Sequence, residues 1–147
     1  RHVSGDIGCH LFAALPPFEL GATTMGYGLG VSSAAAFNGG GGAPRALAFM
    51  GDGGFWHNGL ASGIGGAVFN RSDNVIVIVD NNYSAATGGQ DLPSSRGAHA
   101  KRSTQHPIEQ AVRGVGVQWV KTLTDTYDVK AMRAALEEAL TTPFKGP

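Results

Sequence analysis

Two apolar runs stand out along a chain that is otherwise rich in polar residues and glycine. Residues 45–50, "RALAFM", form the first run, and residues 74–79, "NVIVIV", form the second. The second run is almost entirely β-branched and lacks alternating polar positions, which is typical of a strand covered on both faces of a parallel sheet. Residues 115–120, "VGVQWV", form a third run. We therefore predict strands at these three positions.

Apolar residues at helical spacing occur around these runs. The most regular stripe lies over residues 128–140, which we predict to form a helix with Asp128 as its N-cap. Three further helices are predicted, over residues 26–37, 55–69 and 107–115. Glycines within residues 55–69 disfavour a helix there, whereas Pro107 favours one, because proline is common in a first helical turn.

The alternation of strands and helices predicts a doubly wound α/β fold, with a mostly parallel sheet flanked by helices. Residues 38–44, "NGGGGAP", are expected to be a flexible surface connection. Residues 81–106 are polar and lack periodicity, and loops of that length are mostly functional or disordered. The 147 residues match one domain, residues 1–147, which we expect to be part of a longer polypeptide.

The composition narrows the classes of function. The 11 basic and 11 acidic residues balance to a formal charge of zero, which disfavours binding to nucleic acid or to a membrane. Cys9 is the single cysteine, so a disulfide framework and a cysteine-cage metal site are excluded, and a reduced, cytoplasmic setting is expected. No apolar run approaches the roughly 20 residues of a membrane span, and no signal peptide is recognisable.

Glycine is unusually abundant and gathers around one carboxylate. The chain has 23 glycines in 147 residues, roughly twice the average usage of about 7%. In Gly51-Asp52-Gly53-Gly54 they follow the first predicted strand and open a helix, where backbone N–H groups can approach a phosphate. A carboxylate beside a phosphate is repelled unless a divalent cation lies between them, and Mg²⁺ accepts such a mixed set of ligands.

A second ligand is expected at the end of the next strand. The segment "VDNNYSAATGGQ" begins there and contains Asn81 and Asn82. Residues 54–80 provide enough length for one helix and one strand, so Asp52 and Asn81 are predicted to reach the same edge of the sheet.

Four segments in this order resemble the C-terminal thiamine-diphosphate domain of indolepyruvate:ferredoxin oxidoreductases, which belong to the 2-oxoacid:ferredoxin oxidoreductase superfamily. The segments are "SGDIGCHLFAALPPF" (4–18), "TTMGYGLG" (23–30), "GDGGFWHNG" (51–59) and "DNNYSAATGGQ" (80–90). The resemblance extends over about residues 4–125. It implies that residues 1–147 are a diphosphate-binding (PP-type) thiamine-diphosphate domain. Its enzyme would decarboxylate a 2-oxoacid, of the indolepyruvate or aryl pyruvate type, oxidatively to an acyl-CoA.

The resemblance also implies roles for individual residues. Mg²⁺ would be bound by the carboxylate of Asp52, the amide of Asn81 and the backbone carbonyl of Tyr83. Met25 matches the bulky residue that supports the two rings of the cofactor, and Thr87 lies in the loop that closes over the diphosphate. The positions expected to contact the cofactor are Gly5, Asp6, Ile7, Gly8, Cys9, Met25, Gly26, Gly51, Gly53, Gly54, Phe55, Asn82, Thr87 and Gly88.

Other parts of such an enzyme have no counterpart in this chain. In the family that it resembles, the glutamate that activates the cofactor lies on a separate pyrimidine-binding domain. Iron–sulfur clusters, on a ferredoxin or iron–sulfur domain, and coenzyme A are also expected elsewhere in the complex. We therefore expect the chain to work in an oligomer on a 2-oxoacid substrate and to be inactive alone.

Several polar residues allow two interpretations. His57, one turn into the helix, either contacts the substrate as a catalytic residue or packs against that helix. Asp80 is a ligand or a loop cap, Asn82 a cofactor contact or a turn residue, Asp6 a cofactor neighbour or a turn cap. Cys9 is interpreted as a small buried residue rather than a redox centre. Solvated or core positions are expected for the remaining histidines, His2, His10, His99 and His106.

The basic residues Arg96, Lys101 and Arg102 either form a solvated face or contact coenzyme A phosphates or a partner. Two other functions compete at the level of the whole chain. One is a non-oxidative thiamine-diphosphate decarboxylase or acetolactate-synthase-like carboligase. The other is a degenerate binding or regulatory module that keeps either Mg²⁺–diphosphate affinity or only the fold. A dinucleotide-binding domain is disfavoured because "GYGLG" follows no predicted strand.

Overall fold

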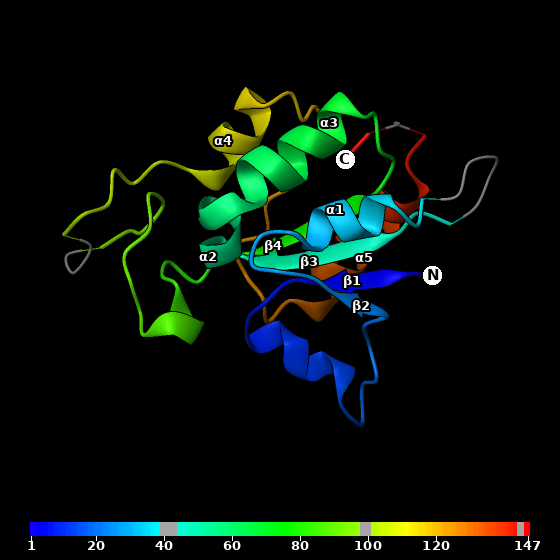
Figure 1. Cartoon of the computed structure of the whole chain (residues 1–147), viewed down its shortest axis with the longest axis horizontal. Coiled ribbons are helices and arrows are strands. Elements are labelled where there is room, and N and C mark those ends of the chain that lie inside the picture. The colour runs from blue at the N-terminus through cyan, green and yellow to red at the C-terminus, as the bar shows by residue number, and fades with distance from the viewer. Residues whose placement is uncertain (39–43, 98–100, 144–145) are drawn as a thin grey trace.

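The computed structural model describes residues 1–38, 44–97, 101–143 and 146–147. Within them, four strands form one sheet in the order β2-β1-β3-β4, and all three pairings are parallel. The strands are β1 (Val3–Gly5), β2 (Thr23–Thr24), β3 (Leu47–Gly51) and β4 (Val75–Val79). Figure 1 shows α1 and the helix between β3 and β4 on one side of this sheet and α5 behind it. The predicted α/β fold with a parallel sheet flanked by helices is confirmed.

The helices are α1 (Gly30–Ala35), α2 (Asp52–Gly54), η2 (Phe55–Gly65), α3 (Gly66–Phe69), α4 (Ile108–Gly114) and α5 (Val129–Thr141). Two short 3₁₀ segments, η1 (Cys9–Ala14) and η3 (Ala85–Thr87), complete the described elements. The elements α2, η2 and α3 follow one another without a break, and the middle one has the wider hydrogen bonding of a π-helix. Asp128 caps α5 as predicted, because its carboxylate accepts a hydrogen bond of 2.9 Å from the backbone N–H of Ala131.

The strand order places a topological switch between β1 and β3. The chain passes from β1 outward to β2 and then returns across β1 to β3 and β4. Successive connections therefore leave the sheet in opposite directions at the carboxyl ends of β1 and β3. In open α/β sheets, such a point opens a crevice in which ligands bind.

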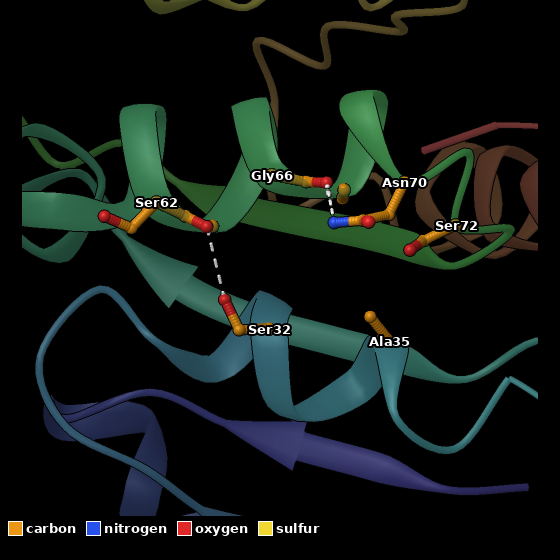
Figure 2. Close-up of a pocket in the computed structure, with 8 residues that line it drawn as sticks. Ser32, Ala35, Ser62, Gly66, Asn70 and Ser72 are labelled. Atoms are coloured by element: carbon orange, nitrogen blue, oxygen red, sulfur yellow. Dashed lines mark hydrogen bonds between the residues drawn. The ribbon is translucent and has the colours of Figure 1, made fainter.

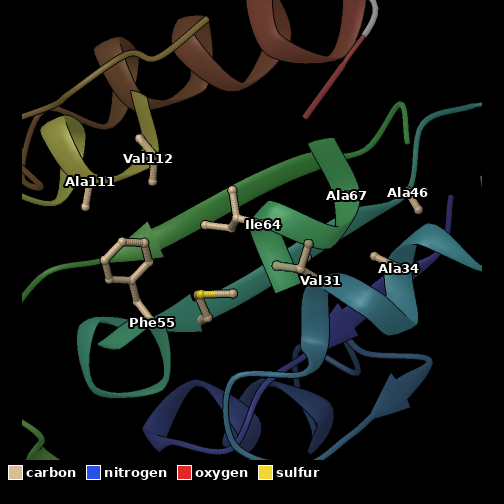
Figure 3. Packing of buried hydrophobic residues seen from close by; sticks show 10 residues of the cluster. Val31, Ala34, Ala46, Phe55, Ile64, Ala67, Ala111 and Val112 are labelled. Atoms are coloured by element: carbon tan, nitrogen blue, oxygen red, sulfur yellow. The ribbon is translucent and has the colours of Figure 1, made fainter. Parts of the chain in front are cut away.

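The core lies between β3 and the helices on one side of the sheet. Alternate residues of the β3 segment, Ala46, Ala48 and Met50, are fully buried against Phe55 and Ile64 of the η2 helix. Figure 3 shows this cluster extending from Ala34 and Val31 of α1 to Ala111 and Val112 of α4. Because the side chains at the end of β3 and the start of η2 share this core, the turn between them is held in place.

The helix after β3 approaches the preceding turn very closely. Gly28 has a φ of +85°, and a Cβ there would lie 2.6 Å from the backbone nitrogen of Gly59 and 2.7 Å from the carbonyl oxygen of Gly54. Only glycine permits both that backbone conformation and that approach. The turn over residues 26–29 and the first turns of the helix thus form one compact unit.

Three sequence predictions need correction. Residues 115–120 form no strand among the described residues, because Gly116 has a φ of +104° and Val117 donates back to the carbonyl of Val112 at the end of α4. The helix predicted over residues 26–37 begins only at Gly30, after the turn at Gly28. The helix predicted from residue 55 begins earlier, at Asp52.

The remaining differences concern segments too short to give a pattern. The strands β1 and β2 were not predicted, because two or three residues carry no periodicity. Most of the glycine-rich connection predicted over residues 38–44 lies outside the described residues. In the described parts of the chain, no helix combines the length and the apolar character needed to cross a membrane.

Candidate functional site

A pocket opens at the carboxyl ends of β1, β3 and β4, beside the topological switch. Its lining comes from residues 7–10 after β1, residues 51–54 at the start of α2, and Val79, Asn81 and residues 83–86 at and after the end of β4, with Tyr27 added from the turn before α1. The sequence placed Asp52 and Asn81 at one edge of the sheet, and both line this pocket.

A second hollow, between α1 and the η2–α3 helix, has a different character (Figure 2). Its lining consists of uncharged residues, and two of its polar side chains bond to backbone carbonyls of other lining residues. The amide of Asn70 donates to the carbonyl of Gly66 at 2.8 Å, and the hydroxyl of Ser32 donates to the carbonyl of Ser62 at 3.3 Å. No charged residue lines it, so the pocket at the strand ends is the candidate site.

The three predicted metal ligands converge in this pocket. The backbone N–H of Asn81 donates to Oδ2 of Asp52 at 3.0 Å. One terminal atom of the Asn81 side-chain amide lies 3.2 Å from both carboxylate oxygens of Asp52 and 2.7 Å from the carbonyl oxygen of Tyr83. If the amide is oriented with its nitrogen at this position, the nitrogen donates to all three oxygens. In the opposite orientation the amide oxygen lies there, and four oxygens come together.

This donor set fits a small divalent cation that also has other ligands. One carboxylate, one amide and one carbonyl are oxygen donors of the kind that Mg²⁺ takes, and Mg²⁺ completes its shell with phosphate oxygens and water. Among the described residues no group of three or more histidine, cysteine, aspartate or glutamate side chains could hold a metal. The residues therefore fit Mg²⁺ held jointly with a diphosphate better than a metal held by protein side chains alone.

The carboxyl group of Asp52 is held in an unfavourable environment for a negative charge. Its side chain is 3% exposed, and burial together with the neighbouring carboxyl group of Asp80 raises the pKa of Asp52 to about 6. Hydrogen bonds from the backbone N–H groups of Gly53 and Asn81 oppose this shift. A cation bound at Asp52 would offset the same penalty, because its positive charge favours the ionised form of that carboxylate.

This raised pKa predicts how the stability of the metal-free protein depends on pH. Between the ordinary carboxyl pKa of 3.8 and about 6, the folded state binds a proton at Asp52 that the unfolded state has lost. The free energy of unfolding should therefore fall as pH rises from about 4 to about 7. Urea unfolding of wild type and Asp52→Asn across this range, in a chelator, measures the effect. Equal slopes for both proteins would show that Asp52 is not its source.

The two glycines after Asp52 leave room for side chains from other segments that pack against them. A Cβ on Gly53 would lie 2.1 Å from the hydroxyl oxygen of Tyr27 and 2.8 Å from that of Ser84. A Cβ on Gly54 would lie 2.2 Å from Oδ2 of Asp6. These contacts bring the turn before α1, the end of β1 and the loop after β4 onto the first turn of α2, so the glycines allow the pocket walls to meet.

Asp6 acts as a structural link between these walls. It is fully buried, and its carboxylate oxygens accept hydrogen bonds of 2.7 and 2.8 Å from the backbone N–H of Gly28 and one of 2.8 Å from Ile7. Burial raises the pKa of Asp6, and these hydrogen bonds lower it. Because its carboxylate is occupied by backbone donors, the geometry favours the turn-capping interpretation of Asp6.

Tyr27 and Ser84 are pocket residues that the sequence analysis missed. Their hydroxyl groups lie 2.8 Å apart, and the Ser84 hydroxyl is 2.9 Å from that of Thr87. This chain of hydroxyl groups ties the loop after β4 to the turn before α1. Tyr27 lies in "MGYG" and Ser84 in "NNYS", which are parts of the recognised segments. Their place in these segments was the signal from which the sequence analysis could have identified them.

Only some of the other residues expected to contact the cofactor line the pocket. Ile7, Gly8, Cys9, Gly51, Gly53 and Gly54 line the pocket. Gly5, Met25, Gly26, Phe55, Asn82, Thr87 and Gly88 are not among the lining residues. The side chain of Phe55 is buried in the core, and its backbone N–H donates to the carbonyl of Asp52, so it is not free for a diphosphate. Met25 is 49% exposed.

The cysteine and histidines fall into distinct environments. Cys9 is exposed at the pocket, which corrects the expectation of a buried packing residue. His57 is exposed, and its ring lies 5.1 Å from that of Tyr27. His10, expected to be solvated or in the core, instead lines the pocket, and its Nε2 is buried with no hydrogen-bond partner among the described residues. His2 bonds to Thr23 and stacks on Phe37.

Among the described residues, His106 and the basic run add no further group to the pocket lining. His106 lies against the ring of Trp56, and His99 falls outside the described residues. The guanidinium of Arg96 pairs with Asp80 at 2.9 Å instead of forming only a solvated face. Lys101 and Arg102 are exposed.

Comparison with known proteins agrees with this geometry. Residues 6–147 match the family model described as "Thiamine pyrophosphate enzyme, C-terminal TPP binding domain", in which TPP is thiamine diphosphate. The chain is 32% identical to the indolepyruvate oxidoreductase subunit IorA of Thermococcus kodakarensis, over 92% of this chain and 23% of the relative. For IorA of Archaeoglobus fulgidus the values are 36% identity, 92% and 21%. The chain thus spans about a fifth of the length of these relatives.

The family match covers every residue that lines the pocket, from the segment after β1 to the loop after β4. The chain belongs to the family of C-terminal thiamine-diphosphate-binding domains of thiamine-diphosphate enzymes.

Proposed function

We propose that residues 1–147 are the diphosphate-binding domain of a thiamine-diphosphate- and Mg²⁺-dependent 2-oxoacid oxidoreductase of the indolepyruvate or aryl pyruvate type. The observation that carries the proposal is the convergence of Asp52, Asn81 and the Tyr83 carbonyl at the edge of the sheet. This convergence lies at the start of the helix that follows β3, where backbone N–H groups favour an anion.

In this proposal, the chain holds the cofactor by its charged end. Asp52, Asn81 and Tyr83 bind Mg²⁺, and the backbone around Gly53 and Gly54 faces the diphosphate. Ile7, Gly8 and Cys9 line the same pocket and would border the part of the cofactor beyond its diphosphate. The cofactor supplies an electron sink for decarboxylation of a 2-oxoacid. The protein's contribution is to fix the position of that group.

His57 is proposed to face the substrate rather than the cofactor. It lies outside the pocket lining and is exposed, and its ring lies 5.1 Å from that of Tyr27, which does line the pocket. The relatives are named as subunits of an oxidoreductase, and this chain matches about a fifth of their length. We propose that a pyrimidine-binding domain, with the activating glutamate, and an iron–sulfur domain or ferredoxin complete the enzyme, with coenzyme A as acyl acceptor.

Titration with thiamine diphosphate tests this function. Isothermal calorimetry should show saturable binding in the presence of Mg²⁺ and a large loss of affinity in a chelator, because the cation links the carboxylate to the diphosphate. Thiamine, which lacks the diphosphate, is the matched control and should bind weakly under both conditions. Equal affinity for thiamine and thiamine diphosphate, or binding unaffected by the chelator, would contradict the proposal.

A further inference from the structure

Arg96 reaches from the far part of the 81–106 loop to both neighbours of Asn81. Its Nη2 donates to Oδ2 of Asp80 at 2.9 Å, and its Nε donates to Oδ1 of Asn82 at 3.0 Å. The planar guanidinium thus spans the two residues that flank a proposed metal ligand. Because Asp80 precedes Asn81 and Asn82 follows it, the Arg96 side chain holds the chain on both sides of Asn81.

Asn82 is the residue at which the chain reverses. Its φ is +73°, in the left-handed region that asparagine tolerates better than most residues. Its backbone N–H donates to Oδ1 of Asp80 at 3.1 Å, and its carbonyl accepts a hydrogen bond from the Ser95 hydroxyl. Ser95 is 2% exposed and itself accepts from the Leu92 N–H at 2.8 Å. The side chain, the backbone N–H and the carbonyl of Asn82 therefore each make a hydrogen bond.

This reversal determines which groups face Asp52. Because the chain turns back at Asn82, the Asn81 amide and the Tyr83 carbonyl come within 2.7 Å of each other beside the Asp52 carboxylate. In an extended chain the Asn81 side chain would stand on a face of the sheet and the Tyr83 carbonyl would lie in its plane, so the two groups would not converge. The contacts of Ser95 and Arg96 thus support the arrangement of the metal ligands without reaching the pocket, since neither residue lines it.

We propose that Arg96 is a positioning residue for the cation site, acting through Asp80 and Asn82 to hold Asn81 and Tyr83 toward Asp52. The inference rests on the proposed function, because it assigns Arg96 to a site for Mg²⁺ and diphosphate. It also gives the basic run a role other than a solvated face: Arg96 is engaged within the domain, whereas the side chain of Arg102 makes no ion pair among the described residues.

The test measures metal affinity directly. Mn²⁺ replaces Mg²⁺ as the probe, and free Mn²⁺ is quantified by electron paramagnetic resonance in the presence of saturating thiamine diphosphate. Arg96→Gln should raise the dissociation constant of Mn²⁺ about tenfold, because loss of a group that orients metal ligands typically costs 10- to 100-fold and Arg96 is 60% exposed. Arg96→Lys should lie between it and wild type, because an ammonium pairs with Asp80 but cannot span to Asn82.

Arg102→Gln is the matched control, since it removes the same charge from the same basic run. It should bind Mn²⁺ as wild type does. If Arg96→Gln equals Arg102→Gln while wild type binds, the positioning role is overturned and the proposed function stands. If wild type fails to bind Mn²⁺ with thiamine diphosphate, the proposed function itself fails. Should Arg96→Gln not fold, Arg96→Lys decides: weaker Mn²⁺ binding upholds the inference and unchanged binding overturns it.

Discussion

Replacing Asp52 with asparagine should abolish Mg²⁺-dependent binding of thiamine diphosphate. The substitution keeps the size of the side chain and removes the single carboxylate among the three proposed metal ligands. Because Mg²⁺ binds proteins through one or two carboxylates together with phosphate oxygens, we expect the affinity for the Mg²⁺–cofactor pair to fall at least about 100-fold. Calorimetry with thiamine diphosphate and Mg²⁺ measures the change.

The same variant should remain folded. Asp52 is 3% exposed, and its burial together with the nearby carboxyl group of Asp80 makes its charge unfavourable, so the neutral amide should not lower the thermal stability of the metal-free protein at neutral pH. Asp125→Asn, at an exposed position away from the pocket, is the control for loss of one negative charge. Binding by Asp52→Asn equal to that of Asp125→Asn would show that Asp52 does not hold the cation.

Gly54→Ala is expected to destabilise the protein although alanine is the better helix former. The new Cβ would lie 2.2 Å from Oδ2 of Asp6 and 3.4 Å from the backbone nitrogen of Gly28. Asp6 cannot withdraw without losing its hydrogen bonds to Gly28 in a fully buried place. Overpacking of this kind typically costs about 1–3 kcal/mol, and the lost hydrogen bonds place Gly54→Ala near the upper end of that range.

Gly66→Ala provides the matched control in the same continuous helix. Nothing lies within 4 Å of a Cβ at Gly66, and its φ of −62° is helical. We expect this variant to be as stable as wild type or more stable by up to about 1 kcal/mol, because glycine is costly in a helix interior. Urea unfolding of both variants compares them. If Gly54→Ala were as stable as Gly66→Ala, the contact between Asp6 and Gly54 would not constrain the site.

The sequence alone was sufficient for the two central strands and for the position of the two metal-ligand side chains. Residues 74–79 are nearly all β-branched, and "RALAFM" ends directly before a glycine turn, so β3 and β4 followed from local preference and hydrophobicity. Residues 54–80 allow one helix and one strand between Gly53 and Asn81, and parallel strands end at the same edge. Asp52 and Asn81 were therefore placed together without coordinates.

Local sequence patterns gave wrong or no predictions where the conformation of a glycine or the pairing with a distant segment determines the backbone. The third predicted strand, residues 115–120, is instead an irregular segment after α4, because Gly116 takes a left-handed conformation that the apolar pattern does not encode. The short strands β1 and β2 exist because they pair with β3 and with each other. Their two or three residues carry too little pattern to predict a strand.

The sequence by itself determined the α/β class, the strand-end position of the Gly-Asp-Gly-Gly turn and the pairing of Asp52 with Asn81, because these depend on residue type and chain length over short distances. Only the tertiary structure decided why Gly53 and Gly54 must be glycine, that Tyr27, Ser84 and His10 line the pocket, and that Arg96 holds the loop beside Asn81. Each of these depends on contacts between segments far apart along the chain. Such contacts form only when the sheet and its helices pack, and no periodicity in the sequence records them.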